Sequence, residues 1–154
     1  MSDAHEHAFA CRLTWTGATT SYAAYERTWV VDFDGKPSLV GSAAPIFRGD
    51  GARHNPEDLL VAALAACHFL SYAALCARRG VILLAYEDAA TGAMSRDDGG
   101  VTRFTEVVLR PIATLADASD VSLALALHEP AHAECFIASS VNFPVRLEPS
   151  TRSR

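Results

Sequence analysis

The feature that most constrains this chain is one long apolar segment, "NPEDLLVAALAACHFLSYAALCARRG", residues 55–80. Its ends carry helix signals, because Asn55 is a good N-cap, Pro56 suits the first helical position and Gly80 follows two arginines. Apolar side chains occupy nearly every face, whereas a helix lying on a sheet needs only one apolar stripe. The pattern predicts a central helix over about 56–79, covered on both sides. It also indicates a homodimer, because 154 residues are few to cover such a helix.

The segments around this helix have the patterns of strands and of one further helix. The segment "RDDGG" joins two long apolar runs and predicts a hairpin, and Pro130 is expected to kink or end the second helix. The order of strands, helix, hairpin, helix and strand predicts an α+β fold in a single domain over 1–154. Frayed ends are expected at about 1–7 and 149–154. The expected strands lie within 9–17, 21–35, 38–47, 81–95, 101–115 and 140–149, and the second helix within about 117–133.

Charge and composition exclude several classes of function. The net charge of −5 and pI near 5.6 argue against an electrostatic grip on nucleic acid or anionic lipid. The first residues lack the basic start and apolar core of a signal peptide, and no apolar run is expected to span a bilayer. A cytoplasmic, reducing setting follows, in which four cysteines are free, catalytic or metal-bound rather than disulfide-bonded.

The cysteines differ in what their positions allow. A helical cysteine is usually a small core residue, and Cys76 fits that interpretation. Cys67 lies nine positions earlier, about half a turn away in phase, so the two cannot form a disulfide within one helix. Cys135 follows the second helix and could meet Cys67 if the two helices pack together.

A reactive Cys67 would have to be a thiolate, which needs a nearby positive charge. Cys67 is about 16 Å along the helix from Pro56, too far for the helix dipole to act. Arg27 lies in "YERTW" on an expected strand among aromatic residues, an unusual place for an idle charge. Glu57, about 15 Å from Cys67 along the helix, could hold such an arginine but not touch the sulfur. The other candidate cations are Arg48, Arg53 and a protonated His68.

The histidines leave a metal site open as an alternative. His128, His132 and Cys135 have the spacing H-x₃-H-x₂-C, which would place three zinc ligands on one face of a continuous helix. Pro130 lies between the histidines and argues against that continuity. No histidine can be placed beside Cys67 together with an orienting acid, which disfavours an acyl hydrolase.

Four motifs resemble those of the OsmC/Ohr superfamily of thiol peroxidases, and within it the OsmC-like branch. They are "NPEDLLVAALAACH", "YEDAATG", "RFTEVVLRP" and "HAECFIASSVNFPV", and the resemblance covers roughly residues 21–148. It implies an α+β, OsmC-like fold in which two central helices (about 56–79 and 117–133) pack with sheets. It also implies an intertwined homodimer with its active sites at the interface.

The resemblance further implies a reductase that converts organic (alkyl or lipid) hydroperoxides to alcohols without metal or other cofactor. Cys67 would be the peroxidatic cysteine, Cys135 the resolving cysteine, Arg27 the catalytic arginine and Glu57 the matching acid. An external dithiol would restore the thiols, with neither nucleic acid nor a membrane as partner. Two alternatives stay open: a non-catalytic dimer that binds an apolar ligand, and a metal-binding protein.

Overall fold

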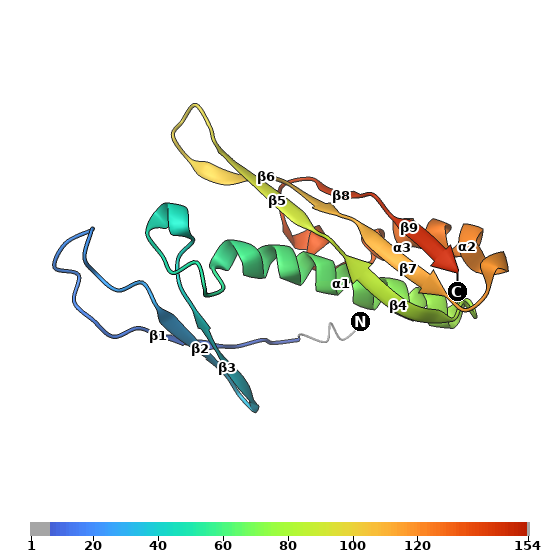
Figure 1. Cartoon of the computed structure of the whole chain (residues 1–154), viewed down its shortest axis with the longest axis horizontal. Helices are drawn as coiled ribbons and strands as arrows, with labels where there is room; N and C mark the ends of the chain where they lie inside the picture. The colour runs from blue at the N-terminus through green and yellow to red at the C-terminus, as the bar shows by residue number, and fades with distance from the viewer. Residues whose placement is uncertain (1–6, 154) are drawn as a thin grey trace, which may run out of the picture. The chain divides into compact units, whose positions relative to one another are not determined.

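The computed structural model describes residues 7–153 and divides into two compact units, Met1–Leu59 and Leu60–Arg154. The first unit contains an antiparallel sheet in the order β1-β2-β3 (Figure 1). A tight turn at Gly35, whose φ of 67° suits a residue without a side chain, joins β2 to β3. The elements are β1 (Arg12–Thr14), β2 (Trp29–Phe33), β3 (Lys36–Gly41) and the 3₁₀ turn η1 (Pro45–Phe47).

Two expectations for this unit are wrong. The chain over 21–28 is not a strand, because the amides of Ala24 and Tyr25 donate to the Ser21 carbonyl and close a turn. Arg27 therefore lies in a loop just before β2. The strand expected over 38–47 ends at Gly41, since Pro45 has no N–H for a sheet and begins η1 instead.

Helix α1 spans Pro56–Arg78, so the predicted central helix is confirmed. Asn55 caps its start, with Oδ1 accepting a hydrogen bond from the Asp58 amide at 2.8 Å. Gly80 ends it in a left-handed conformation with φ 74°, and the Val81 amide donates back to the Cys76 carbonyl at 2.9 Å.

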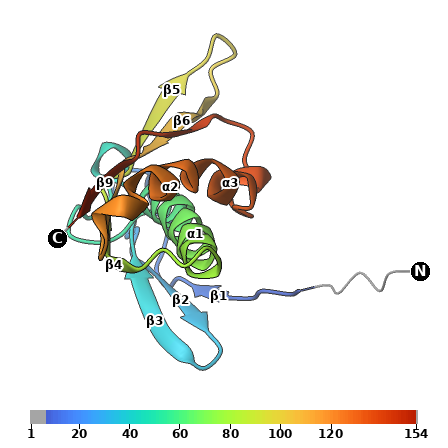
Figure 2. The ribbon, with the colours of Figure 1, turned by 90° about the vertical axis from the view of Figure 1, so that its right-hand side faces the viewer.

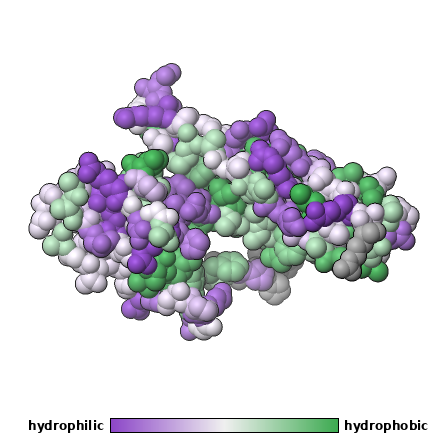
Figure 3. Space-filling model, in the orientation of Figure 1, coloured by the Kyte–Doolittle hydropathy of each residue, from purple (hydrophilic) through white to green (hydrophobic). Residues whose placement is uncertain are grey.

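The second unit contains two three-stranded sheets, in the orders β4-β7-β9 and β5-β6-β8. The predicted hairpin is present, but each long arm divides into two strands that belong to different sheets. Arg110 separates β6 from β7, and its amide donates to Asp88 Oδ1 at 2.7 Å instead of to a strand. Figure 3 shows hydrophilic residues at the projecting hairpin tip. The strands are β4 (Leu83–Asp88), β5 (Thr91–Arg96), β6 (Thr102–Leu109), β7 (Pro111–Leu115), β8 (Val145–Leu147) and β9 (Ser150–Ser153).

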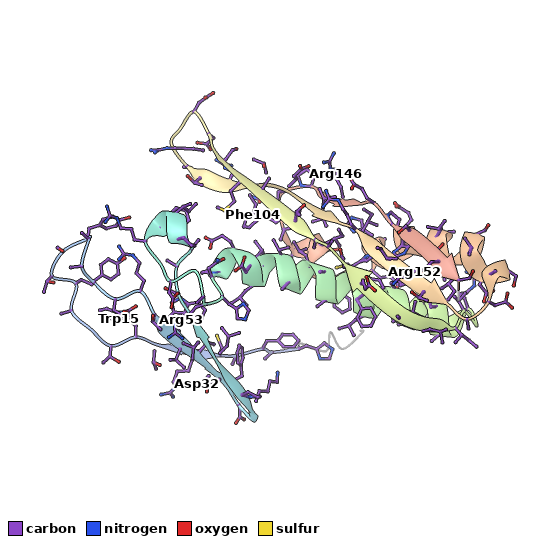
Figure 4. All side chains as sticks on the ribbon, viewed as in Figure 1. Trp15, Asp32, Arg53, Phe104, Arg146 and Arg152 are labelled. Carbon is purple, nitrogen blue, oxygen red and sulfur yellow. The ribbon has the colours of Figure 1, made fainter. Side chains whose placement is uncertain are left out.

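The frayed tail expected over 149–154 is wrong for residues 150–153, which form a strand. Strand β9 pairs in parallel with β7, and β8 pairs in parallel with β6. Arg152, labelled in Figure 4, bonds Glu87 Oε1 at 2.7 Å and Thr114 Oγ1 at 2.9 Å across neighbouring strands. The parallel partner lies far away in sequence, which is why a short polar tail gives no local sign of a strand. Of the predicted frayed N-terminus, residues 1–6 lie outside the described residues.

The second helix is interrupted, as the proline predicted, but at Leu127. Helix α2 spans Val121–Ala126 and follows the 3₁₀ turn η2 (Ala118–Asp120), and α3 spans His128–Ala133. The ring of Pro130 would clash with the carbonyl four residues back, that of Ala126, where α2 ends. Pro130 itself lies in the first turn of α3, where a missing N–H costs little.

One face of α1, formed by Leu64, His68, Tyr72 and Cys76, is fully buried. Leu64 packs in a cluster with β6, and Tyr72 and Cys76 pack in a second cluster with β7, α2 and α3. In Figure 2 the helices α2 and α3 lie beside α1. The remaining faces of α1 are half-buried or exposed.

By length and composition α1 could cross a membrane, with a mean hydropathy of 2.0, and the expectation that no apolar run is long enough is wrong. Its stripe of buried side chains, which includes the polar His68, packs against sheet and helices, as in the core helix of a globular fold. Packing thus accounts for the apolar character of its buried face.

Candidate functional site

The second unit brings Cys67 and Cys135 together. Cys67 lies in the middle of α1 and is half-buried, whereas Cys135 is 1% exposed and follows α3. The Cys135 amide donates to the His132 carbonyl at 3.1 Å, and its carbonyl accepts from the Ser139 amide at 3.0 Å. These bonds fix Cys135 between α3 and the 3₁₀ turn η3 (Ala138–Ser140).

The electrostatics of Cys135 show that the two sulfurs interact. Burial raises the pKa of the Cys135 thiol to about 11, and side-chain contact with Cys67 contributes to the rise. Backbone groups of Ala138 and Ile137 partly oppose it. Cys135 is therefore a protonated thiol at neutral pH that can donate to the sulfur of Cys67, and both cysteines are free.

Cys76 lies on another face of α1 than Cys67, as the helical phase predicted. Cys76 is buried, and desolvation raises the pKa of its thiol. Cys11 is exposed. Only Cys67 and Cys135 form a thiol pair among the described cysteines.

Arg27 belongs to the first unit, where its own neighbourhood holds it. Its guanidinium donates to the carbonyls of Tyr22 at 2.6 Å and Tyr25 at 3.0 Å, and lies 3.9 Å from the centre of the Tyr25 ring. A cation on an aromatic face is attracted by the ring's quadrupole. The prediction that Arg27 lies among aromatic side chains is confirmed, but the residue lies in a loop and not on the expected strand.

Glu57, in the first turn of α1, lies on the same cavity as Arg27. This cavity measures about 510 Å³ and is walled mainly by aromatic and apolar side chains, including Trp15, Trp29 and Phe47. Glu57 Oε2 is buried with no hydrogen-bond partner among the described residues. No ion pair within 4.0 Å joins Glu57 to Arg27 in the part of the chain described, so the orienting role of Glu57 stays a prediction.

The other candidate cations are used differently. Arg53 pairs with Asp50 at 3.1 Å, and the guanidinium of Arg48 lies 5.6 Å from the Tyr22 ring. Burial lowers the pKa of His68 to about 4, so this ring is neutral at pH 7. His68 therefore cannot supply the positive charge considered for it in the sequence analysis.

A histidine pair that the sequence did not predict joins α1 to α3. His68 Nε2 and His128 Nδ1 are 3.0 Å apart and share a hydrogen bond, and both rings are buried. The ring of His132 lies 6.4 Å from that of His68. Helix α3 does continue through Pro130, but no group of three or more His, Cys, Asp or Glu in residues 7–153 could hold a metal ion. The two rings come from positions 60 residues apart, so no local pattern predicts their contact.

Comparison with known proteins identifies the family. The model of the family described as OsmC-like protein matches residues 49–150. No curated protein matches the chain. An OsmC-like protein of unknown function from Vibrio cholerae O1 biovar eltor is 29% identical, with a TM-score of 0.85 over 94% of this chain and 99% of that one.

Two further solved structures share the fold. An organic hydroperoxide resistance protein from Elizabethkingia anophelis is 15% identical, with a TM-score of 0.68 over 97% of this chain and 99% of its own. One from Legionella pneumophila is 18% identical, with a TM-score of 0.68 over 95% and 98%. The predicted α+β fold is confirmed. Because the family model matches more than half of this chain, the chain belongs to the OsmC-like protein family.

Proposed function

We propose that this protein is a thiol-dependent peroxidase that reduces organic hydroperoxides to alcohols. The observation that carries the proposal is the contact between a half-buried thiol, Cys67, and a buried one, Cys135, in the OsmC-like fold. The names of the relatives from Elizabethkingia and Legionella support the substrate class. The apolar character of α1 around Cys67 favours a hydrophobic hydroperoxide over hydrogen peroxide.

In the first step the Cys67 thiolate attacks the outer oxygen of the hydroperoxide. The O–O bond breaks, the sulfur gains the hydroxyl as a sulfenic acid, and the alkoxide takes a proton to leave as the alcohol. The sulfur loses two electrons and the peroxide gains them. The neighbouring Cys135 thiol can stabilise the attacking thiolate by donating its S–H.

In the second step Cys135 attacks the sulfenic sulfur, the disulfide forms, and water leaves. Contact with Cys67 is one of the causes that raise the pKa of Cys135. When Cys67 becomes an uncharged sulfenic acid, the repulsion between two thiolates disappears, so Cys135 ionises more readily. Oxidation of the first thiol thus activates the second. An external dithiol then reduces the disulfide by exchange and restores both thiols.

Arg27 and Glu57 are proposed to complete this site, from the same chain or from a second copy. Arg27 would offer its guanidinium to the Cys67 thiolate and to the peroxide oxygens. Its existing bonds to two tyrosine carbonyls and a tyrosine ring would preorganise it. Glu57 would hold it through the buried carboxylate oxygen that now has no partner among the described residues.

The assembly proposed is a homodimer. Ala62, Ala66 and Leu70 recur every four residues on the face of α1 opposite the buried stripe, and all three are exposed. Leu70 is 65% exposed, and Phe136, next to Cys135, is 81% exposed. A second copy would cover this apolar face of α1 and with it the surroundings of Cys67.

The aromatic cavity of the first unit favours one alternative, a protein that binds an apolar ligand without catalysis. In that alternative Cys67 and Cys135 are structural. Hydroperoxide would then leave both thiols unchanged, and Cys67→Ser would bind the ligand as the wild type does.

The deciding experiment is intact mass and free-thiol count of the reduced protein before and after an equimolar amount of cumene hydroperoxide. We expect loss of two thiols and two hydrogens in the wild type and in Cys76→Ser, the matched control from the same helix. Cys67→Ser should not change. A wild type that keeps all its thiols would refute the peroxidase and favour the ligand-binding alternative. Gain of one oxygen without a disulfide would deny Cys135 its role.

A further inference from the structure

The histidine pair joins α1, which contains Cys67, to α3, which Cys135 follows. His68 comes from α1 and follows Cys67 directly, whereas His128 opens α3, after which Cys135 is held by the His132 carbonyl. The bond between His68 Nε2 and His128 Nδ1, 3.0 Å long, is therefore a direct polar link between the two elements. Tyr72 extends the contact, since its ring stacks on that of His128 with centroids 3.9 Å apart.

Two histidines are an energetically unfavourable choice for filling this buried space. Each neutral imidazole has one N–H and one bare nitrogen, so one ring donates to the other. The outer nitrogens, His68 Nδ1 and His128 Nε2, are buried and have no hydrogen-bond partner among the described residues. A buried polar atom without a partner destabilises the fold, so leucines of similar size would fill this space at least as favourably. Stability therefore does not explain the two histidines.

What a hydrogen bond adds to an apolar contact is direction. Leucine against leucine would let α3 slide or rotate on α1, because the hydrophobic effect is not directional. The imidazole bond fixes one register, as single buried polar residues do in other helix pairs. A disulfide needs that accuracy, since its Cβ atoms must lie within about 3.5–4.5 Å of each other.

We infer that His68 and His128 are positioning residues, a clamp that holds α3 on α1 in the register at which the sulfurs of Cys67 and Cys135 can bond. This inference rests on the proposed function for its place in a catalytic cycle. The clamp acts on the resolving step, by positioning Cys135 rather than by reacting with the substrate. Attack of Cys67 on the hydroperoxide does not require Cys135 to be in register.

Two pairs of variants separate the polar link from the space it fills. His68→Gln places an amide group near the position of Nε2, and His128→Asn does so near Nδ1, so each can keep the bond. His68→Leu and His128→Leu remove it and preserve apolar packing. Tyr72→Phe is the matched control, because it loses a buried hydrogen bond in the same core, that to the Ala124 carbonyl, without touching the link.

The measurement is quenched-flow intact mass during oxidation of the reduced full-length protein by cumene hydroperoxide. Gain of one oxygen reports the sulfenic acid, and loss of two hydrogens reports the disulfide. In both leucine variants we expect disulfide closure to slow by about tenfold or more while sulfenic acid forms within about twofold of the wild-type rate. The Gln and Asn variants and Tyr72→Phe should close at near wild-type rates. Unchanged closure in the leucine variants, or equal loss in Tyr72→Phe, would overturn the clamp.

Oxidation by diamide separates this inference from the peroxidase itself. Diamide takes two electrons and two protons from a thiol pair and needs no peroxide site. If peroxide has no effect but diamide closes the disulfide more slowly in the leucine variants than in the wild type, the clamp stands and the peroxidase falls. If diamide closes the disulfide at the same rate in the leucine variants and in the wild type, the clamp is refuted. Should a leucine variant not fold, His68→Met takes its place, because methionine fills irregular core space and cannot form the bond. Disulfide closure in His68→Met at the wild-type rate would overturn the clamp.

Discussion

Two regions of one helix, around Cys67 and around Cys76, show how differently the same side chain can be placed. Cys76 lies in the cluster with Tyr72, Leu115 and Ala131 and is fully buried. Cys67 is half-buried and contacts a second thiol. Nine positions separate them along the helix, which places the two side chains about half a turn apart, so that the sulfur of Cys76 faces the core. Phase on the helix, and not residue type, separates the structural thiol from the candidate reactive one.

The largest expected difference between the two regions follows from removing each thiol in turn. Cys67→Ser should reduce the rate of cumene hydroperoxide reduction by about a thousandfold or more, because serine cannot become a nucleophilic anion at neutral pH. Cys76→Ser should keep the wild-type rate and lose only stability. The check is peroxide consumption in the presence of dithiothreitol. Equal losses in the two variants would show that the phase argument is wrong.

The partner of Cys67 gives the next largest effect. Cys135→Ser should still form one sulfenic acid, which a sulfenic-acid-specific nucleophile such as dimedone traps and intact mass detects. Turnover with a dithiol should fall by about tenfold to a hundredfold, since the reductant must then attack the sulfenic acid in a half-buried site. Wild-type turnover would show that Cys135 does not resolve the oxidised form.

The core that Cys76 shares with Tyr72 should also make stability depend on pH. Burial holds the pKa of His68 and of His128 at about 4, below the ordinary value of 6.5. The unfolded chain therefore binds more protons between these values, and stability falls as pH drops from about 6.5 towards 4. Urea unfolding should show a loss of roughly 2 kcal/mol per ring between pH 7 and pH 5.

The matched control is the double variant His68→Gln with His128→Asn, which keeps polar groups but cannot titrate there. Its stability should change by roughly 4 kcal/mol less than that of the wild type over the same interval. If the stability of the two proteins changed equally with pH, the two rings would take up protons as readily in the folded state as in the unfolded chain.

The smallest expected effect concerns the Tyr72 hydroxyl, which donates to the Ala124 carbonyl at 3.1 Å. Tyr72→Phe should lower the free energy of unfolding by about 1–2 kcal/mol, the usual cost of a lost buried hydrogen bond. Peroxide reduction should not change, because this hydroxyl belongs to the Cys76 side of the helix. Lost activity at unchanged stability would place Tyr72 in the reactive site, and the Cys76 region would then not be purely structural.

Much of the fold could be predicted because its signals are local. Asn55, Pro56 and Gly80 mark the ends of α1, and the hairpin tip carries its own turn residues. Local signals failed where the partner is distant, as for β9, and where a backbone turn replaces a strand, as at Ser21 before Arg27. They also failed for the two arms of the hairpin, whose bend at Arg110 depends on the Asp88 carboxylate opposite.

By itself, the sequence determined that this protein is an α+β chain built on an apolar helix, and that Cys67 and Cys76 face opposite ways. The period of the helix and the chemistry of its ends require nothing beyond neighbouring residues. Only the tertiary structure decided that Cys67 meets Cys135 and that His68 meets His128, pairs separated by more than half of the second unit. Such contacts depend on how α3 packs on α1, and packing is a property of surfaces that come together only when the chain folds.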